Sequence, residues 1–107
     1  MNSGYRVERF SGAELPTVVE LRRKLESEGY AVYEWTDRPG AVYEVHEHAE
    51  DQTHWIISGS LELEVDGFRR VILGPYDRDL MPAGTKHSAR VVGAEPVRYL
   101  IGEKTLG

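Results

Sequence analysis

Short β-rich segments, separated by turn residues, follow one another from residue 31 to the C-terminal region. Branched and aromatic residues alternate with polar ones in these segments, as is typical of strands. Asp66–Gly67 lies between two of them and predicts a hairpin, because both positions of such a turn need positive φ. Many short, regularly spaced strands indicate an all-β fold, either a sandwich or a barrel. The expected strands are 31–35, 41–48, 52–58, 61–65, 68–73, 78–81, 86–92 and 97–102, and residues 37–40 are expected to form a turn.

One segment before the strands carries the periodicity of a helix. Pro16 suits a first helical turn, and Gly29 suits the position just beyond a helix end. The spacing therefore predicts one α-helix over residues 16–28. Its apolar face would cover the barrel, because apolar residues recur at steps of three and four at Val18, Leu21 and Leu25.

The length and the composition fit one domain. The 107 residues allow a single modest core, with residues 1–30 as an N-terminal segment that packs its helix on a barrel of residues 31–107. The chain contains no cysteine, which excludes disulfides, thiolate ligands and cysteine nucleophiles. Any metal site must therefore use nitrogen or oxygen ligands.

The charge pattern excludes some kinds of partner. The formal net charge is −5 and the basic residues are scattered, so we expect no nucleic-acid binding. No apolar run approaches the roughly 20 residues of a membrane helix, and the first residues lack the apolar core of a secretory signal. We therefore expect no membrane partner and a cytoplasmic location.

Three histidines have the spacing of a possible metal site. His46 and His48 are two apart on an expected strand, so both imidazoles point to the same face. His87 follows a Pro82-x-Gly84 turn much later in the chain, and a closed barrel would bring it opposite the first pair. An isolated His-x-His is also compatible with two surface histidines. The sequence alone therefore does not show that His87 lies close to His46 and His48; this depends on the fold.

Residues 40–59 resemble the first of two sequence motifs of the cupin superfamily. That motif has a glycine, five residues, His-x-His, three or four residues, a glutamate, six residues and a glycine. This chain has Gly40, His46, His48 and Gly59 at these positions, with Gln52 where the glutamate is expected.

The second motif ends in Pro-x-Gly, two residues and a histidine. Pro82, Gly84 and His87 match it, and Asp77 lies where an aspartate often precedes the turn. The chain departs from the pattern at Tyr76, where a glycine is usual, and at Val91, where an asparagine is common. The resemblance implies a double-stranded β-helix of the jelly-roll kind, with a metal inside the barrel.

The resemblance implies His46, His48 and His87 as ligands of one divalent metal ion. Gln52 would be a fourth, neutral ligand or would orient a water molecule. Alternatively, the carboxylate of Glu50 or Asp51 would take the place of the glutamate that the motif has at position 52. Imidazole ligands suit several metals, so zinc, iron, manganese and nickel all remain open.

Three further residues are candidates for a catalytic role in the barrel interior. His54 lies two positions after Gln52 and is a candidate acid/base or replacement ligand, or else a hydrogen-bonded interior histidine. Glu44 shares the face of His46 by alternation and is a candidate carboxylate facing a substrate, or else lies in water at the barrel mouth. Tyr99 is a candidate hydrogen-bond donor to a ligand, or else a core residue.

Alternating apolar residues are expected on the outer face of the barrel. Packing against the N-terminal segment or a second subunit would cover them, and we expect a homodimer. These outer residues are Tyr43, Val45, Trp55 and Ile57.

Two classes of function fit these features. The first is a small metal-dependent enzyme, an oxygenase, isomerase or lyase that acts on a small organic molecule in the barrel. The second is a non-catalytic module that binds a metal or a small ligand. Nucleophilic catalysis is unsupported, because no serine-nucleophile motif or phosphate-binding glycine loop is present.

Overall fold

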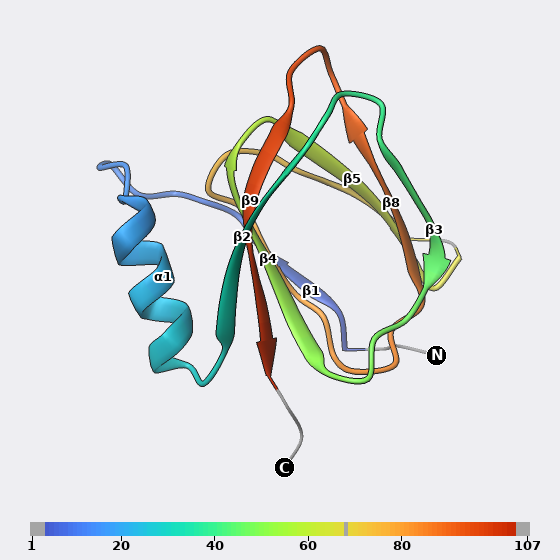
Figure 1. Ribbon diagram of the computed structural model, residues 1–107, viewed down its shortest axis with the longest axis horizontal. Helices are drawn as coiled ribbons and strands as arrows, with labels where there is room; N and C mark the ends of the chain where they lie inside the picture. The colour runs from blue at the N-terminus through green and yellow to red at the C-terminus, as the bar shows by residue number, and fades with distance from the viewer. Residues whose placement is uncertain (1–3, 68, 105–107) are drawn as a thin grey trace.

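Two antiparallel β-sheets face each other, and one helix packs outside them (Figure 1). The structure is a computed structural model that describes residues 4–67 and 69–104. The expected all-β fold with one N-terminal helix is confirmed. In the described part of the chain, no helix has the length and apolarity needed to cross a membrane.

The sheets contain five and four strands. The first sheet has the order β1 (Arg6–Glu8), β7 (Arg78–Leu80), β4 (Asp51–Ser58), β9 (Val97–Lys104) and β2 (Ala31–Asp37). The second sheet has the order β3 (Val42–His46), β8 (His87–Val92), β5 (Ser60–Val65) and β6 (Arg69–Leu73). Except for the hairpin of β5 and β6, neighbouring strands in each sheet are not consecutive in sequence, so the chain crosses repeatedly between the sheets, as in a jelly roll.

The strands agree with the sequence expectation to within a few residues, with two exceptions. Strand β1 was not expected, because three residues are too few to show alternation. It pairs with β7, so the N-terminal segment contributes a strand to the larger sheet. The expected strand start at Phe68 lies outside the described residues. The Asp66–Gly67 hairpin is present, with positive φ at both positions.

Helix α1 spans Val18–Ser27 and covers the outer face of the five-stranded sheet. Thr17 and Glu20 form a reciprocal capping box at its start. Pro16 therefore precedes the cap, and the helix is shorter than expected. Leu21 and Leu25 are buried against the sheet, in a cluster that also contains Leu100, Trp55 and Ile57. The helix thus covers two of the apolar residues expected on the outer face.

The main core lies between the two sheets. Inward-facing residues alternate along β5, where Leu61, Leu63 and Val65 are almost fully buried. Ile56 from β4 packs against them from the opposite sheet. These side chains fill the interior only in part, and the remaining space is a pocket lined by polar and aromatic residues.

Candidate metal centre

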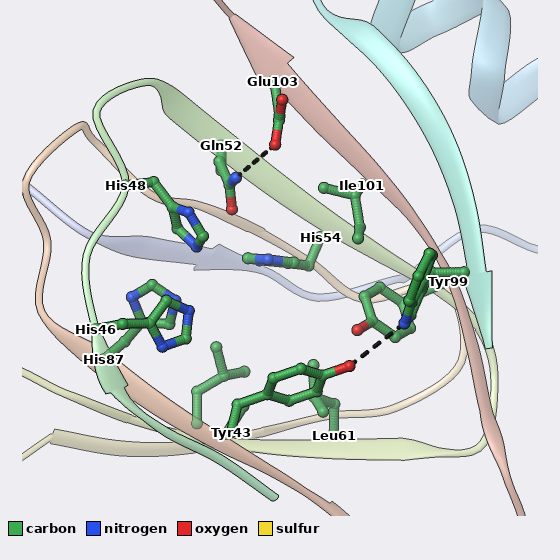
Figure 2. Close-up of a pocket in the computed structure, with 13 residues that line it drawn as sticks. Tyr43, His46, His48, Gln52, His54, Leu61, His87, Tyr99, Ile101 and Glu103 are labelled. Carbon is green, nitrogen blue, oxygen red and sulfur yellow. Dashed lines mark hydrogen bonds between the residues drawn. The ribbon is translucent and has the colours of Figure 1, made fainter. Parts of the chain in front are cut away.

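The three expected histidines meet at one side of the pocket (Figure 2). One nitrogen from each of His46, His48 and His87 lies within 4.8 Å of the others. His46 ends β3 and pairs directly with His87, which opens β8, while His48 follows in the loop after β3. The fold therefore brings His87 next to His46 and His48, although about forty positions separate them in sequence.

Backbone hydrogen bonds orient two of the rings. His46 Nδ1 lies 2.6 Å from the Glu44 carbonyl oxygen, and His87 Nδ1 lies 3.0 Å from the Thr85 carbonyl oxygen. Because a carbonyl oxygen can only accept, each Nδ1 carries the proton and each Nε2 keeps its lone pair. This arrangement is typical of metal-ligating histidines, whose second nitrogen donates to a carbonyl or a carboxylate.

The protonation states also fit a cation site. Burial is the largest cause that lowers the pKa of His87 to about 4, although the hydrogen bond to Thr85 acts in the opposite direction. Burial, followed by the charge of the neighbouring His46 ring, lowers the pKa of His48. These two rings are neutral near pH 7, which is the form that binds a metal.

Gln52 lines the same pocket and is held by a residue that the sequence analysis missed. Its side-chain Nε2 donates to Glu103 Oε1 at 3.0 Å, and the two residues are direct partners on β4 and β9. The amide oxygen therefore points away from Glu103, into the pocket (Figure 2). The two-residue alternation Tyr99, Ile101, Glu103 could have placed Glu103 inside, but the sequence analysis ended this strand at residue 102.

Neither alternative carboxylate belongs to this cluster. Asp51 Oδ1 accepts a hydrogen bond from the Ala83 backbone nitrogen at 2.8 Å, and Asp51 lines a different cavity. Glu50 is not part of the pocket lining. Among the described lining residues, Glu103 carries the one carboxylate. The fold therefore does not place Glu50 or Asp51 where either could replace the missing glutamate ligand.

His54 is buried between the two ends of the pocket and pairs with a fully buried carboxylate. Its Nδ1 lies 3.0 Å from Asp79 Oδ1, and Tyr5 donates its hydroxyl proton to Asp79 Oδ2 at 2.9 Å. Burial alone would lower the pKa of His54, but the charge and the hydrogen bond of Asp79 outweigh it and raise the pKa. Asp79 thereby fixes the orientation of the His54 ring, because Nδ1 is hydrogen-bonded to its carboxylate.

The pocket has a volume of about 260 Å³. The His54 ring centroid lies 6.5 Å from that of His87 and 6.1 Å from that of Tyr99, so His54 is close to both sides. Apolar side chains form the remaining wall, namely Leu61, Leu63, Ala89 and Ile101. This space suits one compact organic molecule.

Opposite the histidines, aromatic residues surround Asp37, which the sequence analysis assigned to a turn. Asp37 is instead the last residue of β2 and is buried, with 9% of its surface exposed. It accepts hydrogen bonds from Trp35 Nε1 at 3.1 Å, Tyr43 Oη at 2.7 Å and Tyr99 Oη at 2.8 Å. The Tyr99 proton, which one of the two interpretations would donate to a ligand, is therefore donated to Asp37.

A β-bulge in β3 reverses the expected faces of two residues. Tyr43 pairs with Ala89 and His46 pairs with His87, so β3 has one more residue than β8 in this interval. The extra residue breaks the two-residue alternation. Tyr43 consequently lines the pocket instead of the outer face that was expected for it. Glu44 is exposed outside the pocket, which fits its alternative placement in water and not a carboxylate facing a substrate. Val45 lies exposed on the outer face as expected.

Comparison with known protein families identifies the fold from the sequence. The model of the family described as "Cupin domain" matches residues 33–102 of this chain. The matched region begins in β2 and contains every residue that lines the pocket except Glu103. No curated protein matches the chain.

Solved structures share this fold. The DMSP lyase DddQ from Ruegeria pomeroyi is 26% identical with a TM-score of 0.65, over 72% of this chain and 39% of that one. A deletion mutant of Bacillus subtilis oxalate decarboxylase OxdC is 28% identical with a TM-score of 0.62, over 71% and 22%. A DUF861 family protein from Thermotoga maritima, 20% identical with a TM-score of 0.59, is matched over 91% and 96% and shows the fold alone. The chain thus spans well under half the length of the first two.

Proposed function

The chain belongs to the cupin domain family, and from this premise we propose that it binds one divalent metal ion and acts as a small metal-dependent enzyme. The proposed ligands are His46, His48 and His87, with Gln52 as a fourth, oxygen-donating ligand. The substrate would be a small organic molecule in the pocket of about 260 Å³.

One observation carries this proposal: three imidazole nitrogens lie within 4.8 Å of one another on the pocket wall. Nδ1 of His46 and of His87 is hydrogen-bonded to a backbone carbonyl, which leaves Nε2 as the free nitrogen of these rings. Three imidazole nitrogens and one amide oxygen suit zinc, iron, manganese or nickel, with positions left for a ligand.

When bound, the metal would supply Lewis-acid polarisation of a substrate oxygen. The protein's own contribution would come from His54, whose ring lies in the pocket between its two sides. Because Asp79 fixes Nδ1, the Nε2 atom of His54 is the one that can accept or release a proton. The apolar wall around Leu61 and Ile101 would exclude water from that transfer.

Isomerase or lyase chemistry uses these groups most directly. Both reaction types need a proton taken from or returned to carbon, which is a role for a buried histidine backed by a carboxylate. Two similar structures, at 26% and 28% identity, are named a lyase and a decarboxylase. Oxygenase chemistry is the other member of this class, and the neutral Gln52 in place of a carboxylate favours it less.

The alternative function is a non-catalytic module that binds a metal or a small ligand. The hydrogen bond from Tyr99 to Asp37 supports it, because this interior tyrosine has no proton to give to a reacting group. In this alternative, His54 would serve only to hold the interior together.

Metal binding is tested by titrating metal-free protein with zinc, iron(II), manganese and nickel salts and measuring stoichiometry by elemental analysis. We expect one ion per chain in the wild type and substoichiometric metal in His87→Ala. Glu44→Gln is the matched control, because Glu44 lies next to the site in sequence but outside the pocket, and it should bind like the wild type. Equal binding by all three proteins would refute the site.

The enzyme and the binding module are separated by following bound ligands over time. A ligand that binds the loaded wild type is incubated with it and with His54→Gln, and the reaction is followed by NMR. Conversion by the wild type and binding without conversion by the variant would support the enzyme. Binding without conversion in both proteins, across a panel of small carboxylates and hydroxy acids, would support the module.

The homodimer and the cytoplasmic location stay predictions. Val42 and Val45 lie exposed on the outer face of β3, at 63% and 67% of their surface. Size-exclusion chromatography with light scattering would give the mass in solution: twice the chain mass supports the dimer, and a single chain mass contradicts it.

A further inference from the structure

The side of the pocket opposite the histidines is formed by one buried carboxylate and three aromatic side chains. Trp35 and Tyr99 are direct partners on β2 and β9, and Tyr43 reaches them from β3 of the facing sheet. Asp37 lies behind them and accepts a hydrogen bond from each. All three aromatic residues, but not Asp37 itself, line the pocket.

These hydrogen bonds use every side-chain donor of Trp35, Tyr43 and Tyr99. Each tyrosine hydroxyl has one proton, and both protons go to Asp37, at 2.7 Å from Tyr43 and 2.8 Å from Tyr99. The single indole proton of Trp35 is shared between Asp37 Oδ1 and Tyr43 Oη. A ligand here meets oxygen lone pairs and aromatic rings, and an anionic or carbonyl group would find no free side-chain donor among these three residues.

The carboxylate of Asp37 has no cationic partner among the described residues. No arginine, lysine or histidine side chain forms an ion pair with it within residues 4–67 and 69–104. Burial, then the hydrogen bond and charge of Asp37, raise the pKa of Tyr99, so its hydroxyl keeps the proton that it donates to Asp37. The field at this side of the pocket therefore favours a cation.

We propose that the Trp35–Tyr43–Tyr99 side of the pocket binds an alkylated cationic group, such as a quaternary ammonium, of a small ligand. Aromatic faces attract such a cation through their quadrupoles, and its alkyl groups need no hydrogen bonds. The inference rests on the proposed function only for the opposite end of the ligand, where an oxygen group would reach the metal.

The geometry between the two sides extends this proposal to the substrate class. His54 lies about equally far from the rings of His87 and Tyr99, at 6.5 Å and 6.1 Å. A compact molecule with an anionic oxygen at one end and an onium group at the other would pass beside His54. Its central carbon atoms would then be the ones that exchange a proton with this histidine.

The test compares two isosteric probes that differ in charge. Choline carries a trimethylammonium group, and 3,3-dimethyl-1-butanol carries a neutral tert-butyl group of the same shape. We expect choline to bind wild-type protein about fivefold more tightly, in both the zinc-loaded and the metal-free form, measured by NMR titration. Equal or tighter binding of the neutral alcohol to the wild type would overturn the proposal.

Two variants connect the preference to these residues. Asp37→Asn should reduce the ratio of the two affinities to about one, and an unchanged ratio would overturn the proposal. Trp35→Leu removes one ring at a half-exposed position, so it is the variant to use if Asp37→Asn fails to fold. It should reduce the ratio at least twofold, and an unchanged ratio would again overturn the proposal.

The outcome is independent of the metal. Neither probe contains a carboxylate, and the metal-free titration needs no ion. If wild-type protein binds metal but shows no preference for choline, the onium site is refuted and the metal site is retained. If it prefers choline but binds no metal, the metal site is refuted and the onium site is retained.

Discussion

At the histidine side of the pocket, backbone carbonyls take the Nδ1 protons and leave nitrogen lone pairs facing inward, whereas at the opposite side one carboxylate takes every side-chain proton. Both arrangements leave acceptors toward the pocket. The first offers close, directional lone pairs, which suit a metal ion. The second offers aromatic rings with a carboxylate behind them, which suit a diffuse organic cation.

The two sides also depend on different parts of the chain. His46, His48 and His87 lie in or beside two neighbouring strands of one sheet. The Asp37 side joins β2 and β9 of one sheet to β3 of the other. Changes at the histidine side should therefore act on metal affinity, and changes at the Asp37 side should act on stability and on the charge preference of the ligand.

The largest effect should come from His87→Ala. Changing a group that only orients a ligand commonly costs about 10–100-fold in metal affinity, so losing a ligand should cost more than about 100-fold. The measurement is competition with a chromophoric zinc chelator. An equal loss in Asp37→Asn would break the comparison, because Asp37 is not part of the histidine cluster.

Asp37→Asn should instead destabilise the metal-free fold by about 2 kcal/mol, because a buried group that accepts three hydrogen bonds loses its charge. Urea unfolding monitored by tryptophan fluorescence gives the free energy of unfolding. His87→Ala is the comparison, and we expect a smaller loss in the metal-free protein, because this ring lies at the wall of an existing pocket and makes one hydrogen bond where Asp37 accepts three. The reverse order of the two effects would contradict the account.

Alkaline pH should affect the Asp37 side. Burial first, and then Asp37, raise the pKa values of both Tyr99 and Tyr43. Because the folded pKa lies above the unfolded value of about 10, the unfolded chain loses these protons first. Stability is then retained below pH 10 and falls above it by up to about 1.4 kcal/mol per pH unit for each tyrosine.

The measurement for this prediction is urea unfolding of metal-free protein between pH 9 and 11. Tyr99→Phe is the control and should flatten the decrease, since it removes one of the titrating groups. A stability that rises over this range, or the same decrease in the variant, would contradict the assignment.

The smallest effect should come from Glu103→Ala. This change removes the acceptor that holds the Gln52 amide, so the amide oxygen is no longer fixed toward the pocket. We expect zinc affinity to fall by about tenfold at most. Glu103→Gln keeps an acceptor at this position and should recover most of the loss. No change in Glu103→Ala would mean that Gln52 does not contact the metal.

The sequence predicted the histidine side better than the Asp37 side. The spacings within two motifs predicted that His46, His48 and His87 form one site. The two-residue period of the strand predicted that Gln52 and His54 face the interior. It placed Tyr43 on the wrong face and left the position of Glu44 open, because one extra residue in a bulge reverses the alternation and leaves no mark in the sequence.

The partners of the buried groups could not be predicted either. Asp37, Asp79 and Glu103 pair with residues 2 to 74 positions away, and most of these pairs depend on strand register. An aspartate before a Pro–Gly sequence is most simply interpreted as a turn residue. The sequence therefore located the chemistry of the site and missed the groups that orient it.

X-ray absorption spectroscopy of the zinc-loaded protein tests the central claim most directly, because it counts the ligands around the ion. We expect the multiple-scattering signal of three imidazoles, with zinc–nitrogen distances of about 2.0–2.1 Å, and two imidazoles in His87→Ala at zinc concentrations that still load it. A wild-type signal with one imidazole or none, or the same signal in both proteins, would contradict a metal centre built from His46, His48 and His87.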